Sequence, residues 1–74
     1  MELTKVYVNR TAYVVWFQRE DSPRDRLKVY LDPTGNNEMV IAQVYVDDEW
    51  KSSHQMDPVQ AAPIIEAARF FIGQ

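Results

Sequence analysis

Two alternating apolar runs joined by a dense turn constrain the fold of this chain more than any other feature. In the first run, Leu27, Val29 and Leu31 alternate with other residues, as in a strand with one buried face. Residues 32–37 combine a proline, a glycine and two asparagines, which favour a turn. Strands joined by so short a loop form an antiparallel hairpin. In the second run, residues 39–46, the residues expected to face the core are Val40, Ala42, Val44 and Val46.

Further strand signals flank this hairpin. Residues 4–19 are rich in β-branched and aromatic types, a composition that favours strands. Within them, Asn9-Arg10-Thr11 is either a tight turn between two strands or a polar stretch of one long bent strand, and we favour two strands. Residues 20–26 are polar and are expected to form a loop. Residues 50–55 form either a short edge strand or irregular structure.

The C-terminal part of the chain has the pattern of a helix. Asp57 is expected to cap the helix N-terminus, with Pro58 at the first helical position. Pro63 opposes a continuous helix, because proline loses a hydrogen bond and clashes with the preceding turn. We therefore predict a short turn from Pro58 to Ala62 and a new helix from Pro63 to Ile72, ended by Gly73. The residues expected to pack on the sheet are Ile64, Ile65, Ala68, Phe71 and Ile72.

These elements predict a single α+β domain over residues 1–74, an antiparallel sheet of three to four strands packed by a C-terminal helix. A chain of 74 residues buries only about 60% of its unfolded surface, and oligomerisation is a common source of added stability at this size. The chain has no cysteine, which excludes disulfides and thiol chemistry. Because no signal-peptide pattern and no long apolar run is present, we expect a cytoplasmic protein without a membrane partner.

Charge is unevenly distributed along the chain. The net charge is −3 and the pI is about 4.9, whereas a non-specific duplex-DNA binder is expected to be basic. Basic residues outnumber acidic ones in residues 1–30, and the reverse holds in residues 31–74. The acidic half either keeps the protein soluble or steers it onto a basic partner. A candidate partner-binding patch there consists of Asp47, Asp48, Glu49, Trp50 and Phe70.

The sheet face opposite the helix is the main candidate site. Residues 12–19 are apolar on both faces, which is typical of a strand covered on both sides, and a single helix covers only one. The tyrosines of this face either stabilise the sheet through cross-strand pairs, form a protein interface, or stack the bases of a single strand. By alternation, this face carries Lys5, Tyr7, Lys28, Tyr30 and Tyr45.

No motif for catalysis, a metal or a cofactor is evident in the sequence. The two glycines are isolated, so there is no glycine-rich phosphate loop, and His54 is the only histidine. The order of several strands followed by a C-terminal helix resembles the single-stranded-DNA-binding coactivator fold. That resemblance implies nucleic-acid binding as an alternative function.

We therefore predict a small acidic, non-enzymatic interaction module. It is expected to bind a protein partner as a homodimer, with inhibition of a host nucleic-acid-handling enzyme as one such role, in the manner of small acidic domains of bacterial viruses. The alternative is a single-stranded nucleic-acid-binding protein that uses its tyrosine-rich sheet face.

Overall fold

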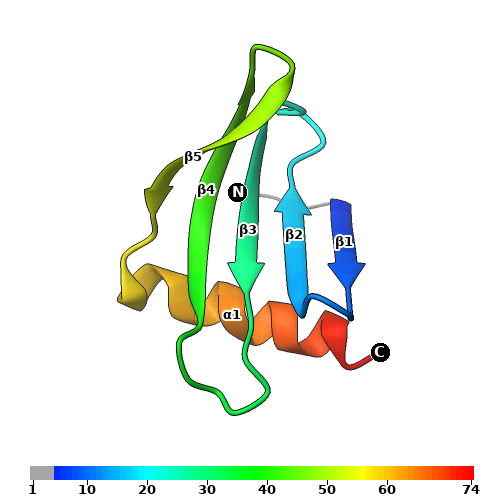
Figure 1. Ribbon diagram of the computed structural model, residues 1–74, viewed down its shortest axis with the longest axis vertical. Helices are drawn as coiled ribbons and strands as arrows, with labels where there is room; N and C mark the ends of the chain where they lie inside the picture. The colour runs from blue at the N-terminus through cyan, green and yellow to red at the C-terminus, as the bar shows by residue number, and fades with distance from the viewer. Residues whose placement is uncertain (1–4) are drawn as a thin grey trace.

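The chain forms an antiparallel meander in which each strand pairs with its neighbour in sequence, followed by one helix. A computed structural model describes residues 5–74. Figure 1 shows the helix crossing one end of the sheet, on one face only. This confirms the predicted α+β fold, with five strands rather than three to four. The elements are β1 (Lys5–Asn9), β2 (Val14–Gln18), β3 (Asp25–Tyr30), β4 (Met39–Val46), β5 (Glu49–Gln55) and α1 (Pro58–Ile72).

The N-terminal segment forms two strands, as we favoured, and residue 4 lies outside the described residues. The side chain of Asn9 accepts a hydrogen bond from the Ala12 amide at 2.9 Å, which closes the turn after β1. The loop between β2 and β3, residues 19–24, is shorter than the predicted loop over residues 20–26. β3 begins at Asp25 because Arg26 pairs with Gln18 on β2 and with Gln43 on β4.

The two later turns follow from their residue types. In the first, the Gly35 amide donates to the Asp32 carbonyl at 2.8 Å, and the Asp32 carboxylate accepts from the Thr34 amide at 2.9 Å. In the second, Asp47 and Asp48 have φ angles of 54° and 64°. Two consecutive positive φ angles are typical of a two-residue hairpin turn. The turn leads directly into β5, so residues 50–55 form an edge strand rather than irregular structure.

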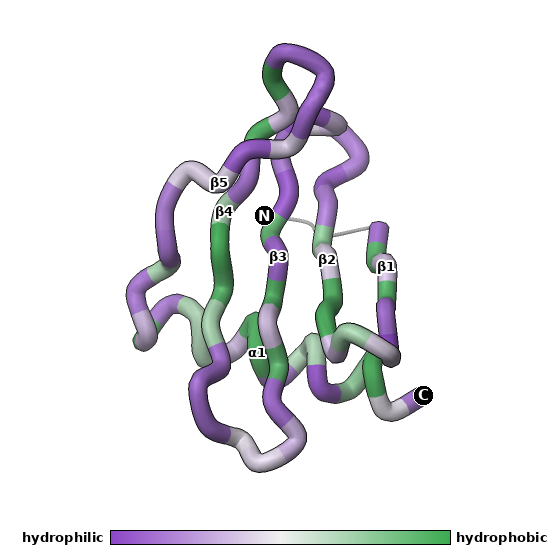
Figure 2. Tube along the Cα trace, viewed as in Figure 1, coloured by the Kyte–Doolittle hydropathy of each residue, from purple (hydrophilic) through white to green (hydrophobic). Residues whose placement is uncertain are grey.

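The core lies between α1 and the end of the sheet that α1 covers. Figure 2 shows apolar and polar residues alternating along the strands and a largely apolar helix. The predicted helix face packs on the sheet, with Ala68 and Ile72 buried. Val44 and Val46 were expected in the core but are 37% and 41% exposed, because they lie on β4 beyond the reach of α1. The buried cluster consists of Val15, Phe17, Leu27, Val29, Leu31, Val40, Ala61, Ala68 and Ile72.

The helix start also differs from the prediction. α1 runs without interruption from Pro58 to Ile72, with Pro63 inside it. Asp57 caps it as predicted, because its carboxylate accepts a hydrogen bond from the Val59 amide at 3.1 Å. The prediction of a separate turn was wrong because packing outweighs the cost of the proline. Ala61 is only 3% exposed, and it packs the first turns of α1 against the sheet.

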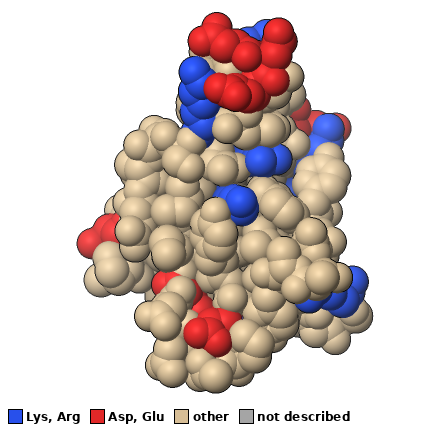
Figure 3. Space-filling view, in the orientation of Figure 1, with Lys and Arg blue, Asp and Glu red and all other residues tan. Residues whose placement is uncertain are grey.

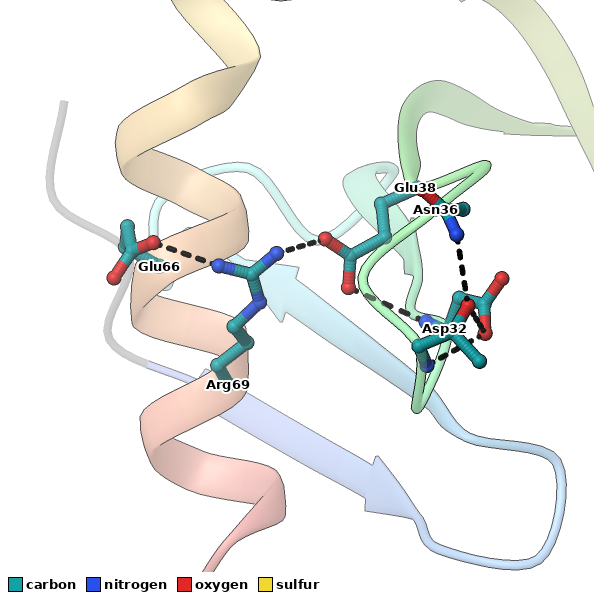
Figure 4. A network of polar contacts seen from close by, with 6 residues as sticks. Asp32, Asn36, Glu38, Glu66 and Arg69 are labelled. Carbon is teal, nitrogen blue, oxygen red and sulfur yellow. Dashed lines mark hydrogen bonds and ion pairs between the residues drawn. The ribbon is translucent and has the colours of Figure 1, made fainter.

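A polar network ties the loop between β3 and β4 to α1 (Figure 4). The Glu38 side chain is only 7% exposed, and it accepts a hydrogen bond from the Asp32 amide at 3.2 Å. Its other oxygen pairs with Arg69, which also donates to Glu66 at 2.8 Å. These carboxylates raise the pKa of Arg69, chiefly through the hydrogen bond to Glu38.

Among residues 5–74, no helix is long and apolar enough to cross a membrane.

Candidate functional site

The sheet face turned away from α1, which we call the open face, gathers aromatic and basic side chains from all five strands. Strand register places Tyr7 beside Trp16 and Trp16 beside Lys28, while Tyr45 pairs with Trp50. All five residues of the predicted sheet-face site therefore lie on this face. Its aromatic residues are Tyr7, Trp16, Tyr30, Tyr45 and Trp50, and its basic residues are Lys5, Arg26 and Lys28.

The open face is locally basic although the chain is acidic. Of the two acidic residues within the strands, Asp25 lies opposite Val44 and Glu49 opposite Val46, so both point to the helix side. Figure 3 views the open face, with the strands in front of α1. Basic groups lie in its middle amid uncharged surface, and acidic groups gather at the tip of the β4–β5 hairpin. Negative charge is thus kept away from the centre of the face.

The two central cations lie against aromatic rings. The Arg26 guanidinium carbon lies 4.1 Å from the ring centroid of Trp50 and 5.6 Å from that of Trp16. The Lys28 ammonium lies 4.8 Å from the centroid of Tyr30 and 5.7 Å from that of Trp16. Cations at these distances are attracted to the negative faces of the rings. The rings therefore hold both cations in place.

Neither central cation is neutralised by a carboxylate. Within residues 5–74, the ion pairs involve Arg19, Lys51 and Arg69, and none includes Arg26 or Lys28. A ring attracts a cation without cancelling its charge. The centre of the open face therefore retains two positive charges for an external anion.

Arg26 is also held by a buried glutamine. Its Nε donates a hydrogen bond to the side-chain oxygen of Gln43 at 2.7 Å, and Gln43 is 8% exposed. Burial lowers the pKa of Arg26, yet a guanidinium stays charged at neutral pH. In the described part of the chain, the terminal nitrogens of Arg26 have no hydrogen-bond acceptor.

An open hollow of about 390 Å³ lies beside this arginine. The indole N–H of Trp16 is buried and has no partner among the residues that the structure describes. Tyr7, at 54% exposure, is the most accessible aromatic ring on the face. The hollow therefore combines the unused terminal donors of Arg26 with the accessible ring of Tyr7. It is lined by Tyr7, Trp16, Gln18, Arg26 and Trp50.

The residues of the second candidate patch do not lie together in the structure. Asp47 and Glu49 lie at the hairpin tip, where Lys51 approaches their carboxylates at 3.6 and 3.7 Å. Trp50 belongs to the open face, because neighbouring residues of a strand point to opposite faces. Phe70 lies near the C-terminal end of α1, at the opposite end of the sheet from that tip (Figure 1).

Two residues that shape the open face were missed by the sequence reasoning, Trp16 and Arg26, whereas alternation places Gln43 on this face. Trp16 was read as part of a doubly covered strand, and Arg26 was assigned to a loop. Extending the alternation of Lys28 and Tyr30 by one further step would have placed Arg26 beside them. Nothing in the local sequence singles out Gln43 as the partner of that arginine.

The described residues contain no group of three or more histidine, cysteine, aspartate or glutamate side chains placed to hold a metal ion. His54 lies with its Nδ1 at 3.3 Å from the Ser53 hydroxyl, on the exposed edge strand. A comparison with protein families, curated protein sequences and solved structures finds no match to this chain.

Proposed function

We propose that the open face binds single-stranded nucleic acid. The observation that carries this proposal is the placement of Arg26 and Lys28 among five aromatic rings, without a carboxylate partner in the described chain. An anionic ligand with planar groups matches such a surface, because phosphates meet the cations and bases stack on the rings. This function is non-enzymatic.

A single strand fits this face better than a duplex. Bases of a single strand are free to stack on protein rings, and each such contact is worth about 1–3 kcal/mol. In a duplex the bases are already stacked on one another, and binding depends on neutralising many phosphates. The acidic chain as a whole opposes the duplex mode, whereas the local charge of the open face supports the single-strand mode.

A matched pair of charge variants tests this proposal. Lys28→Gln removes a cation from the open face, whereas Lys51→Gln removes one that is paired with Asp47 and Glu49. We expect Lys28→Gln to weaken binding of a fluorescein-labelled oligothymidine about fivefold at low salt, as loss of about 1 kcal/mol implies. Fluorescence anisotropy measures the affinity of both variants.

The control variant, Lys51→Gln, shows whether binding depends on where the lost charge lies. Lys51→Gln is expected to leave the affinity unchanged or slightly weaker, because its charge is already compensated at the hairpin tip. Equal losses in both variants would assign binding to net charge alone. Absence of any anisotropy change for the wild-type protein at low salt would refute the proposal.

Binding of a protein partner is the second candidate function. Val59 and Phe70 are 81% and 63% exposed on the outer side of α1, whose only charged residues are Glu66 and Arg69. An apolar outer side suits contact with a second copy of the chain or another protein. Inhibition of a host enzyme that handles nucleic acid is one such role, with the acidic hairpin tip meeting its basic surface. Sedimentation of a monomer at high concentration, with no protein recovered from lysate, would count against this candidate.

A further inference from the structure

We infer that Arg26 binds a backbone phosphate of the strand through its two terminal nitrogens, and that Gln43 is a positioning residue that orients the guanidinium. This inference rests on the proposed function and deepens it, because it names the group that recognises the ligand. It assigns the hollow beside Arg26 to one nucleotide unit.

Two contacts fix the orientation of the Arg26 guanidinium. Trp50 holds it from one side at 4.1 Å, and Gln43 engages its Nε at 2.7 Å. A guanidinium is planar, so fixing one nitrogen and one face also fixes the direction of the remaining donors. These donors are the two terminal nitrogens, whose fork matches the spacing of two phosphate oxygens.

The side chain that orients Arg26 is the neutral amide of Gln43. Gln43 is a buried polar residue of the sheet, at 8% exposure. A neutral amide oxygen orients the guanidinium and leaves its positive charge intact. A carboxylate at the same position would orient it equally well but would neutralise it. The neutral partner thus preserves an anion site.

The space beside Arg26 is large enough for a ligand. The hollow of about 390 Å³ exceeds a phosphate group and extends to the exposed ring of Tyr7. Arg26, whose terminal nitrogens have no acceptor in the described chain, lines this space. Donors without acceptors select a ligand rich in acceptor oxygens, and the ring offers a stacking surface for the attached base.

Two variants test this inference against simple electrostatics. Arg26→Lys keeps the charge but removes the fork, and Gln43→Glu keeps the side-chain shape but neutralises the arginine. We expect each to weaken binding of labelled oligothymidine about tenfold in anisotropy titrations. Arg26→Lys should leave the slope of log affinity against log salt unchanged. Gln43→Glu should reduce that slope by about 0.7, the value for one phosphate contact on a single strand.

The outcomes separate this inference from the proposed function. If both variants bind like the wild-type protein, the inference is overturned and the open face acts through charge and stacking alone. If the wild-type protein does not bind at low salt, the proposed function and the inference both fail. Thermal melting followed by circular dichroism confirms folding, and Gln43→Glu should stay folded because its new ion pair lies where a hydrogen bond already exists. A loss of affinity in folded Gln43→Glu without a change in salt slope would overturn the conclusion that the neutral amide of Gln43 preserves an anion site at Arg26.

Discussion

Single charged residues in this protein divide according to whether a carboxylate pairs with them. Arg69 joins Glu38 and Glu66 and serves the fold, because it links the β3–β4 loop to α1. Arg26 and Lys28 lie against rings instead and keep their charge available. The same type of side chain therefore has a structural role at one position and a proposed binding role at another.

Replacing the buried carboxylate should destabilise the protein. Glu38→Gln removes the charge from a side chain that is 7% exposed and bonded to the Asp32 amide and Arg69. Hydrogen bonds to charged groups contribute about 1.5–3 kcal/mol, so we expect the free energy of unfolding to fall by about 1–3 kcal/mol. Urea denaturation measures this change. The control is Glu66→Gln, whose side chain is 72% exposed and whose loss should cost under about 0.5 kcal/mol; equal effects would contradict the structural role of Glu38.

At the scale of elements, α1 shows how packing overrides a local preference. Pro63 lacks the amide that would bond the carbonyl of Val59 one turn earlier. Both residues are exposed, so water is able to reach that carbonyl. Burial of Ala61 on the near side keeps the first turns helical. The helix is thus continuous although its sequence contains a helix breaker.

Removing the internal proline should stabilise the helix. Pro63→Ala restores the missing amide, and proline in a helix interior costs about 3 kcal/mol relative to alanine. Part of this gain is offset because alanine gives the unfolded chain more freedom. We expect the free energy of unfolding to rise by about 1–2 kcal/mol in urea titrations.

Pro58→Ala is the matched control for this prediction. Pro58 occupies the first helical position, where its lack of an amide costs nothing. Its replacement should change the free energy of unfolding by less than about 0.5 kcal/mol. A Pro63→Ala variant no more stable than Pro58→Ala would show that α1 accommodates the internal proline without strain.

In the whole molecule, the fold places basic and acidic groups on different parts of the surface. The net charge of −3 conceals an open face whose strand positions carry Lys5, Arg26 and Lys28. Figure 3 shows many acidic groups at the β4–β5 tip and others near the lower end and the left edge, outside the centre of the face. A strand approaching the open face thus meets positive charge, while the tip repels it from one side.

Salt dependence should report this separation. Three basic residues that each neutralise one phosphate predict a slope of log affinity against log salt of about −2, at about −0.7 per contact on a single strand. Replacing Asp47 and Asp48 by asparagine should keep the turn, because asparagine accepts positive φ angles. We expect these replacements to raise the affinity about twofold at low salt and to leave it unchanged near physiological salt, where the screening length is about 8 Å. A changed slope would mean that the tip itself contacts the strand.

Features that depend on a few neighbouring residues could be predicted from the sequence. Alternation placed Leu27, Val29 and Leu31 on the buried face, and the residue types at 32–37 marked the turn. Asp57 followed by Pro58 marked the start of the helix. Such signals are local, because side-chain direction, φ preference and capping act within about one turn or one strand pair.

The extent to which α1 covers the sheet could not be predicted from the sequence, because it depends on how the whole chain packs. Val44 and Val46 continue the apolar alternation of β4 but lie beyond the helix, so the pattern alone assigned them wrongly to the core. The open face depends on contacts between distant strands, such as Arg26 on Trp50 and Arg26 to Gln43. These pairings arise from strand register and from the free energy of packing the whole chain, which no short segment of sequence encodes.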